Sequence, residues 1–272
     1  MDRTLEKPVA FLSPPPAEPH QLAAALAQLE PIALAEMEEV KLLARVDTKF
    51  LMTEEQFLAI VGAVEPHYRI LTNQGVRASL YWTQYFDTPE YILYLDHHND
   101  RRERYKVRSR CYVDSDAAFL EIKHKTKRSR TIKTRRQIPA MPDVLEGDNL
   151  AFVRAHYPHN PWRLEAVIWN TFHRITLVSK EQQERLTVDV GLRFGWGEAQ
   201  GDLCGIAIAE VKQPKFSYES RFLQELRRYG IFRTGFSKYC AGMAHVYPQL
   251  KTNRFKRRDM LIDQLLRRRG LP

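Results

Sequence analysis

Polar and apolar residues alternate with a period of two through the middle of the chain. The alternation runs in short stretches from about residue 79 to residue 138 and resumes between 163 and 213, with turn signals such as HHND and DSD between stretches. Because successive side chains of a strand point to opposite faces, this pattern predicts consecutive antiparallel strands. We expect strands at 79–87, 91–97, 103–113, 117–125, 130–138, 163–178, 185–195 and 203–213.

Apolar residues at helical spacing flank the predicted strands. They predict two helices between residues 21 and 43, divided by Pro31. A third helix is expected at 54–61, with Thr53 as its N-cap and Gln56 as the capping partner. Further helices are expected at 146–156, 217–229 and 237–247, followed by a basic amphipathic helix in the final segment RFKRRDMLIDQLLRRRG.

The order of these elements favours an α+β protein built on one sheet. About eight strands with few long helices between them predict an antiparallel eight-stranded β-barrel with flanking helices, in preference to a parallel α/β fold. The length of 272 residues fits one large β-rich domain. We expect a disordered or loosely packed proline-rich segment at 1–19, the barrel domain at 20–249, and a basic C-terminal helix or tail at 250–272.

Composition narrows the partners and the compartment. Lys and Arg number 42 against 33 Asp and Glu, a formal net charge of +9, which favours a polyanionic partner such as nucleic acid, nucleotide, polyphosphate or an acidic membrane surface. The cysteines Cys111, Cys204 and Cys240 are odd in number and lack CxxC spacing, which argues against disulfides and a zinc site. With neither a signal-peptide pattern nor an apolar run of about 20 residues, the chain is expected to be cytoplasmic, associating with membranes only through a partner or the basic tail.

Basic residues occupy alternate positions of the predicted strands. The segments ERYKVRSRCY, FLEIKHK, TIKTRRQI, RLTVDVGL and IAEVK place on one face the side chains of Arg104, Lys106, Arg108, Arg110, Lys123, Lys125, Lys133, Arg135, Arg185 and Lys212. Like charges on neighbouring strands destabilise a sheet unless an anion neutralises them. The pattern therefore predicts a phosphate-rich ligand across this face, which would line a tunnel if the sheet closes; the alternative is a solvated outer face.

Carboxylates on the same strands are candidate ligands for a divalent cation. Glu210 ranks first, followed by Glu121 and Asp189. A divalent cation that bridges phosphate oxygens needs one or two hard oxygen ligands of this kind. The alternative for each carboxylate is an ion pair with a neighbouring Arg or Lys.

Nine segments resemble, in the same order, those of the triphosphate tunnel metalloenzymes (CYTH-like superfamily), and within it the VTC-type polyphosphate polymerase domain. They span roughly residues 40–246: RVDTKF, YFDTPEY, HHNDRRERYKVRSRCY, FLEIKHK, TIKTRRQI, HRITLV, RLTVDVGLRF, AEVKQ and GFSKYCAGM. The resemblance departs from the family pattern at His173, where an aromatic residue is usual, and at Asp100, where glycine is common.

The resemblance implies a function and a set of site residues. By similarity, Glu210 would hold a catalytic Mn²⁺ or Mg²⁺, and the reaction would transfer the γ-phosphoryl group of ATP to a polyphosphate chain with release of ADP. The residues that would line a triphosphate tunnel are Lys49, Arg108, Arg110, Lys123, Lys133, Arg135, Arg174, Arg185 and Lys238.

Phosphoryl transfer asks a protein mainly to position reactants and neutralise charge, and cations with a metal suffice for it. No Walker loop, GxGxxG or HExxH points elsewhere. The alternatives are a hydrolase or cyclase on the same scaffold, and a noncatalytic polyanion-binding module. Because Tyr81, Tyr85 and Phe86 fall where strand core is expected, no nucleic acid is expected as a partner. ATP and polyphosphate are the expected partners, with a separately encoded membrane protein as a further one.

Overall fold

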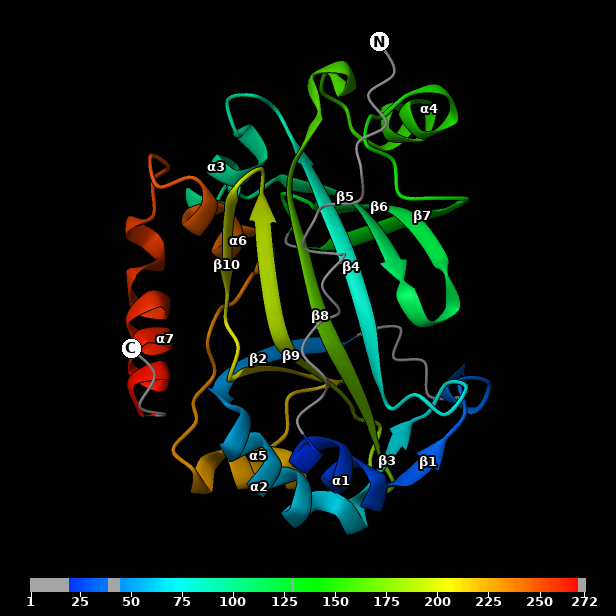
Figure 1. The fold of residues 1–272 in the computed structure, drawn as a ribbon, viewed down its shortest axis with the longest axis vertical. Helices are drawn as coiled ribbons and strands as arrows, with labels where there is room; N and C mark the ends of the chain where they lie inside the picture. Colours follow the sequence, from blue (N-terminus) through cyan, green and yellow to red (C-terminus); the bar gives the residue numbers. More distant parts are fainter. Residues whose placement is uncertain (1–19, 39–44, 129, 269–272) are drawn as a thin grey trace.

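A computed structural model describes residues 20–38, 45–128 and 130–268; the predicted proline-rich segment at 1–19 lies outside this range. One strongly twisted sheet of eleven strands dominates the described chain (Figure 1). The strands are β1 Glu30–Ile32, β2 Val46–Thr53, β3 Tyr68–Leu71, β4 Ala78–Asp87, β5 Arg104–Tyr112, β6 Ala117–Lys125, β7 Thr131–Ile138, β8 Glu165–Ser179, β9 Arg185–Trp196, β10 Ala199–Asp202 and β11 Ile206–Gln213.

Eight of these strands follow one another in the order β2-β11-β9-β8-β4-β5-β6-β7, each antiparallel to its neighbours. The short β3 and β10 pair antiparallel with β8 and β9, while β1 runs parallel to β3. The prediction of an antiparallel sheet with flanking helices is confirmed, but the closed eight-stranded barrel is wrong. In the described chain no pairing joins β7 to β2, so the sheet is open.

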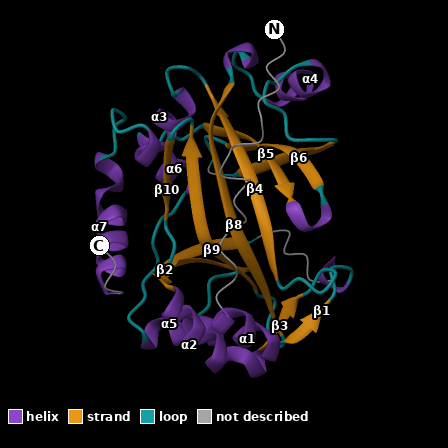
Figure 2. Ribbon diagram, in the orientation of Figure 1, coloured by secondary structure: helices purple, strands orange, loops and turns teal. Residues whose placement is uncertain are grey.

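The helices lie around this sheet (Figure 2). They are α1 His20–Gln28, α2 Glu54–Val64, α3 Ile92–His98, α4 Gly147–His156, α5 Arg221–Arg228, α6 Lys238–Val246 and α7 Lys256–Arg268. The predicted capping box of α2 is present: Gln56 N donates to Thr53 Oγ1 at 3.1 Å, and Thr53 N donates to Gln56 Oε1 at 3.0 Å. None of the described helices is long and apolar enough to cross a membrane.

Two predicted elements are wrong. Residues 91–97 form most of α3 instead of a strand, because Asp87 at the end of β4 accepts hydrogen bonds from Leu93 N and Tyr94 N and so initiates a helix. The second N-terminal helix is replaced by β1 and by a single 3₁₀ turn, Glu36–Glu38, while residues 39–44 lie outside the described range. The strands β1, β2, β3 and β10 were not predicted.

The two faces of the sheet differ as the alternation predicts. One face is apolar: α1, α2 and α5 share a buried core with residues of β2, β8, β9 and β11, and α4 shares another with β5, β6 and β7. The opposite face, called here the inner face, carries the alternating charged side chains. At one end of the inner face, α6 packs so closely that a Cβ on Gly242 would lie 2.5 Å from Ile168 Cδ1. The C-terminal α7 buries Ile262 and Leu265 in the same core as α6.

Candidate phosphate-binding site

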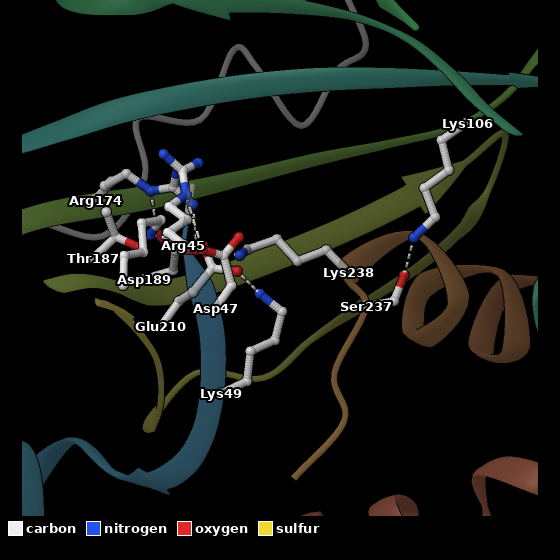
Figure 3. Close-up of polar contacts among 11 residues, drawn as sticks. Arg45, Asp47, Lys49, Lys106, Arg174, Thr187, Asp189, Glu210, Ser237 and Lys238 are labelled. Atoms are coloured by element: carbon white, nitrogen blue, oxygen red, sulfur yellow. Dashed lines mark hydrogen bonds and ion pairs between the residues drawn. The ribbon is translucent and has the colours of Figure 1, made fainter. Parts of the chain in front are cut away.

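Strand register brings the charged residues of the inner face into rows. Across β2, β11 and β9, Lys49 lies opposite Glu210, and Glu210 opposite Thr187. Across β8 and β9, Arg174 lies opposite Asp189. These side chains converge from separate strands in Figure 3. Residues more than 150 positions apart in the chain are thus assembled by sheet pairing alone.

Two carboxylates anchor one half of the inner face. Asp189 accepts hydrogen bonds from Arg174 Nε at 2.6 Å and Nη2 at 2.7 Å, and it also pairs with Lys238, which reaches over from the start of α6. Burial alone would raise the pKa of the Asp189 carboxyl, but Arg174 and Lys238 hold that pKa well below its usual range. Both partners are therefore fixed by a carboxylate that stays ionised.

Glu210 is held in a similar way by two lysines. Its oxygens pair with Lys49 and, at 2.7 Å, with Lys212 Nζ, which also donates to Thr187 Oγ1 at 2.7 Å. Burial works against ionisation, yet Lys212 and Lys49 keep the pKa of Glu210 well below its usual range. Burial lowers the pKa of Lys212 to about 8 although Glu210 opposes that shift. Each carboxylate of this half is thus shared by two cations, Asp189 by Arg174 and Lys238, and Glu210 by Lys49 and Lys212.

A third pair crosses β5 and β6. Arg108 contacts Glu121 Oε2 through Nε at 2.7 Å and through Nη2 at 2.6 Å. Burial would raise the pKa of Glu121, but Arg108 and Arg110 lower it. Glu121 and Asp189 thus both form ion pairs with neighbouring basic residues, which is the alternative to metal binding that the sequence left open.

The rest of β5, β6 and β7 carries cations without such compensation. Within the described part of the chain, no ion pair with a carboxylate is found for Lys106, Arg110, Lys123 or Lys133. Lys106 Nζ donates to Ser237 Oγ at 2.7 Å, and Arg110 Nε donates to Thr83 Oγ1 at 3.1 Å, so both bond to neutral hydroxyls. This uncompensated group of four is called here the cation row.

Lys123 lies at the centre of the cation row. It is opposite Lys106 on β5 and opposite Lys133 on β7. Desolvation by the surrounding protein, and then the charges of Lys106 and Lys133, lower the pKa of Lys123 to about 7, although the residue is exposed. Burial lowers the pKa values of Lys106 and Lys133 as well. A bound polyanion would relieve this mutual repulsion.

The remaining predicted residues are Arg104, Lys125, Arg135 and Arg185. Arg135 stacks over the Phe119 ring at 4.9 Å, and Arg185 Nε is buried without a hydrogen-bond partner. Arg104 and Lys125 lie opposite each other at the outer end of β5 and β6. Arg104 donates to Asp100 Oδ1 at 3.0 Å, so the neighbouring turn already engages it.

The structure adds inner-face residues that were not predicted. Arg45 and Asp47 precede Lys49 on and beside β2 and bond to each other at 2.9 Å. Figure 3 places them beside Glu210 and Arg174. Ser237 is a further residue that was not predicted, and it accepts a hydrogen bond from Lys106. The same period-two pattern in RVDTKF could have revealed Arg45 and Asp47, had β2 been recognised as a strand.

The carboxylates of the inner face decide whether it could bind the Mg²⁺ or Mn²⁺ that the resemblance implies. The described residues contain no group of three or more His, Cys, Asp or Glu side chains that could hold a metal ion. Mg²⁺ and Mn²⁺ do not need one, because they commonly bind through one or two carboxylates together with substrate phosphates and water. Glu210 fits this mode, since a cation could replace Lys49 at one carboxylate oxygen. Asp189 fits less well, because Arg174 occupies both of its oxygens.

An antiparallel sheet with an excess of cations on one face suits a polyanionic ligand. The family model described as the VTC domain matches residues 44–247, and the chain belongs to this family. No curated protein sequence matches the chain.

Several solved structures are similar in fold. One is a candidate adenylate cyclase from Bacillus halodurans, at 15% identity and a TM-score of 0.46, with 78% of this chain and 97% of that chain covered. Another is a candidate adenylyl cyclase from Hippeastrum described as having a dominant triphosphatase activity, at 14% identity and a TM-score of 0.49, with 74% and 96% covered. At these levels the likeness says nothing about what this chain acts on.

Proposed function

We propose that the protein is a polyphosphate polymerase that transfers the γ-phosphoryl group of ATP to the end of an inorganic polyphosphate chain and releases ADP. A terminal oxygen of the chain attacks the γ-phosphorus, a new P–O bond forms, and the bond to the β–γ bridging oxygen breaks, with its electrons leaving on ADP. With all phosphates ionised, the transfer conserves charge and neither releases nor takes up a proton.

The cation row is the observation that carries the proposal. A nucleoside triphosphate could be held where the cations are already fixed by carboxylates, between Lys49, Arg174 and Lys238. Lys106, Arg110, Lys123 and Lys133 would then remain to neutralise further phosphates. A substrate with more phosphates than one nucleotide fits this excess of charge better than a triphosphate alone.

The ionisation of the carboxylates also supports transfer to a phosphate over hydrolysis. A water nucleophile must lose a proton, and a base assists that step best when its pKa lies near the working pH. The pKa values of Glu121, Asp189 and Glu210 are all lowered, so these carboxylates are weak bases. A phosphate oxygen carries no proton to remove.

Glu210 would hold the divalent cation, Mn²⁺ or Mg²⁺, which supplies neutralisation of charge on the phosphates. Lys49 and Lys212, released in part from Glu210, would then be available to phosphate oxygens. Arg174 and Lys238, oriented by Asp189, would orient the triphosphate for in-line attack.

The test is incubation of the purified protein with ATP and Mn²⁺, with products resolved by length on a gel. Glu210→Gln should abolish the ladder of polyphosphate, whereas Glu181→Gln, at an exposed carboxylate paired with His67, should leave it unchanged. Orthophosphate alone from the wild-type protein would refute the polymerase and favour a hydrolase. Binding of tripolyphosphate without any turnover would favour a noncatalytic binding module or a requirement for a partner.

A further inference from the structure

Two of the segments that carry the family resemblance contact each other in the fold, and their contact is not one of the ion pairs of the inner face. YFDTPEY ends β4 with Asp87, and GFSKYCAGM begins α6. The Tyr239 hydroxyl, in the first turn of α6, donates a hydrogen bond to Asp87 Oδ2. Both side chains are buried, with exposed fractions of 0% for Asp87 and 1% for Tyr239.

Asp87 is a rigid acceptor. Its carboxylate accepts hydrogen bonds from the backbone N–H groups of Thr88 at 2.7 Å, Leu93 at 2.8 Å and Tyr94 at 2.9 Å, which fix it at the start of α3. Among the described residues, Tyr239 supplies the one side-chain hydrogen bond that it receives. Burial raises the pKa of the Asp87 carboxyl, and these four donors oppose that shift. Loss of the tyrosine hydroxyl would therefore leave one oxygen of a buried carboxyl with a single donor.

Tyr239 directly follows two residues that contact the phosphate site, Ser237 and Lys238. Lys238, directly before it, extends to Asp189 and passes over the Phe172 ring at 4.2 Å. Ser237 accepts from Lys106 Nζ at 2.7 Å and from Cys240 N at 3.2 Å, so it caps α6 and contacts the cation row at once. The first turn of α6 thus delivers side chains to both halves of the inner face.

The Tyr239 ring also contacts the floor of the site. It stacks on Tyr85 of β4 with ring centroids 4.9 Å apart, and the Tyr85 hydroxyl lies 3.5 Å from Arg108 Nη1. Lys106 Nζ lies 5.7 Å from the centre of the Tyr239 ring. Any rotation of this ring would disturb several cation positions together.

We infer that Tyr239 is a positioning residue: its hydrogen bond to Asp87 fixes the first turn of α6 so that Lys238 reaches the phosphates on the inner face. The Lys238 side chain is held at its base by the first turn of α6 and at its ammonium by Asp189, so a shift of that turn would displace the ammonium from the position that meets a phosphate oxygen. The role of Lys238 in the reaction rests on the proposed function. The coupling between Tyr239 and Lys238 rests on the geometry alone.

A double-mutant cycle tests the coupling. Turnover of ATP with Mn²⁺ and affinity for inorganic tripolyphosphate are measured for the wild-type protein, Tyr239→Phe, Lys238→Ala and the double variant. We expect Tyr239→Phe to lower kcat about tenfold with a smaller change in KM, since displacement of a reacting group by about 1 Å can cost up to about a hundredfold. In the Lys238→Ala background, Tyr239→Phe should cost little more, because the group that it positions is already gone.

Tyr94→Phe is the matched control. Tyr94 is equally buried and its hydroxyl donates to the Lys251 carbonyl at 2.7 Å, so the variant loses a tyrosine hydrogen bond but keeps its backbone hydrogen bond to Asp87 and the hydrogen bond between Tyr239 and Asp87. It should lower the unfolding temperature, yet leave kcat and tripolyphosphate affinity unchanged. Equal losses for Tyr239→Phe with and without Lys238, or no loss in either background, would overturn the inference.

Failure of the proposed function gives a different pattern. If the wild-type protein turns over no ATP, the polymerase assignment fails. The double-mutant cycle is then evaluated from the tripolyphosphate affinities alone. The coupling then stands if Tyr239→Phe weakens binding severalfold only while Lys238 is present. If Lys238→Ala itself changes neither turnover nor affinity, Lys238 does not contact phosphate and the positioning role is wrong.

Discussion

The lowered pKa of Lys123 leads to a measurable uptake of protons when a phosphate chain binds. With a pKa of about 7 in the free protein, Lys123 is roughly one-tenth protonated at pH 8. A bound polyanion favours the charged form and raises that pKa. Lys123 should therefore take up about 0.9 proton per tripolyphosphate bound at pH 8, the difference between full and one-tenth protonation.

The variant Lys123→Gln isolates this contribution. Tripolyphosphate and the other lysines also exchange protons on binding, but those contributions are largely common to both proteins. Isothermal titration calorimetry at pH 8, in two buffers of different ionisation enthalpy and without metal, gives the number of protons for each protein. The wild-type protein should take up about 0.9 proton more than Lys123→Gln. Lys127→Gln, at an exposed lysine near Glu103, should match the wild-type protein.

The same linkage fixes the direction of the pH dependence. Relative to Lys123→Gln, the wild-type dissociation constant should rise by an additional factor of about five between pH 7 and pH 8 and of about ten between pH 8 and pH 9, because the number of extra protons taken up on binding grows from about one half to about one. Equal proton counts for the two proteins would refute the reasoning. That result would mean that Lys123 is already charged in the free protein and that the lysines of the cation row do not repel one another enough to shift its pKa.

Three further outcomes follow from the contacts. Arg110→Ala should weaken tripolyphosphate binding because it removes one cation of the row. Arg108→Ala also leaves Glu121 without its hydrogen-bonded partner, and should in addition lower the free energy of unfolding by roughly 1–3 kcal/mol in a urea titration. Tripolyphosphate at a hundred times its dissociation constant should stabilise the wild-type protein by about 2.7 kcal/mol in the same titration. Leu265→Ala in α7, whose side chain is buried, should cost about 2–5 kcal/mol, while Met260→Ala on the exposed side of α7 should change stability by less than about 0.5 kcal/mol.

Much of the sheet could be predicted because its strands obey one simple rule. In β5 and β6, alternation placed Arg108 and Lys123 on one face and Val107 and Ile122 on the other, and the structure buries the latter two in the apolar core. The strand β2 was missed because VDTKFLMT alternates only in its first half; its last four residues are all buried. Such a run does not distinguish a strand from a helix by periodicity alone.

What could not be predicted depends on contacts between distant segments. Residues 91–97 were predicted as a strand because Asp87 was assigned to the preceding strand. Its role as the hydrogen-bond acceptor that begins α3 was therefore missed. Closure of the sheet was expected because the number of strands fits a barrel, but strand count does not determine whether the two edges pair. The pairing of Lys238 with Asp189 required the position of α6, which no local pattern contains.

The distribution of charge over the inner face connects the fold to the proposed reaction. Where β8, β9, β11 and β2 meet, Asp189 and Glu210 each pair with two cations, so that half can be organised before any ligand binds. Across β5, β6 and β7 no carboxylate pairs with the described cation row, and a bound polyanion would favour its fully charged form. A protein that merely stored phosphate would gain affinity from uncompensated cations in both halves. An enzyme instead needs one half preorganised for the reacting phosphates and another that binds a chain whose length changes with each turnover.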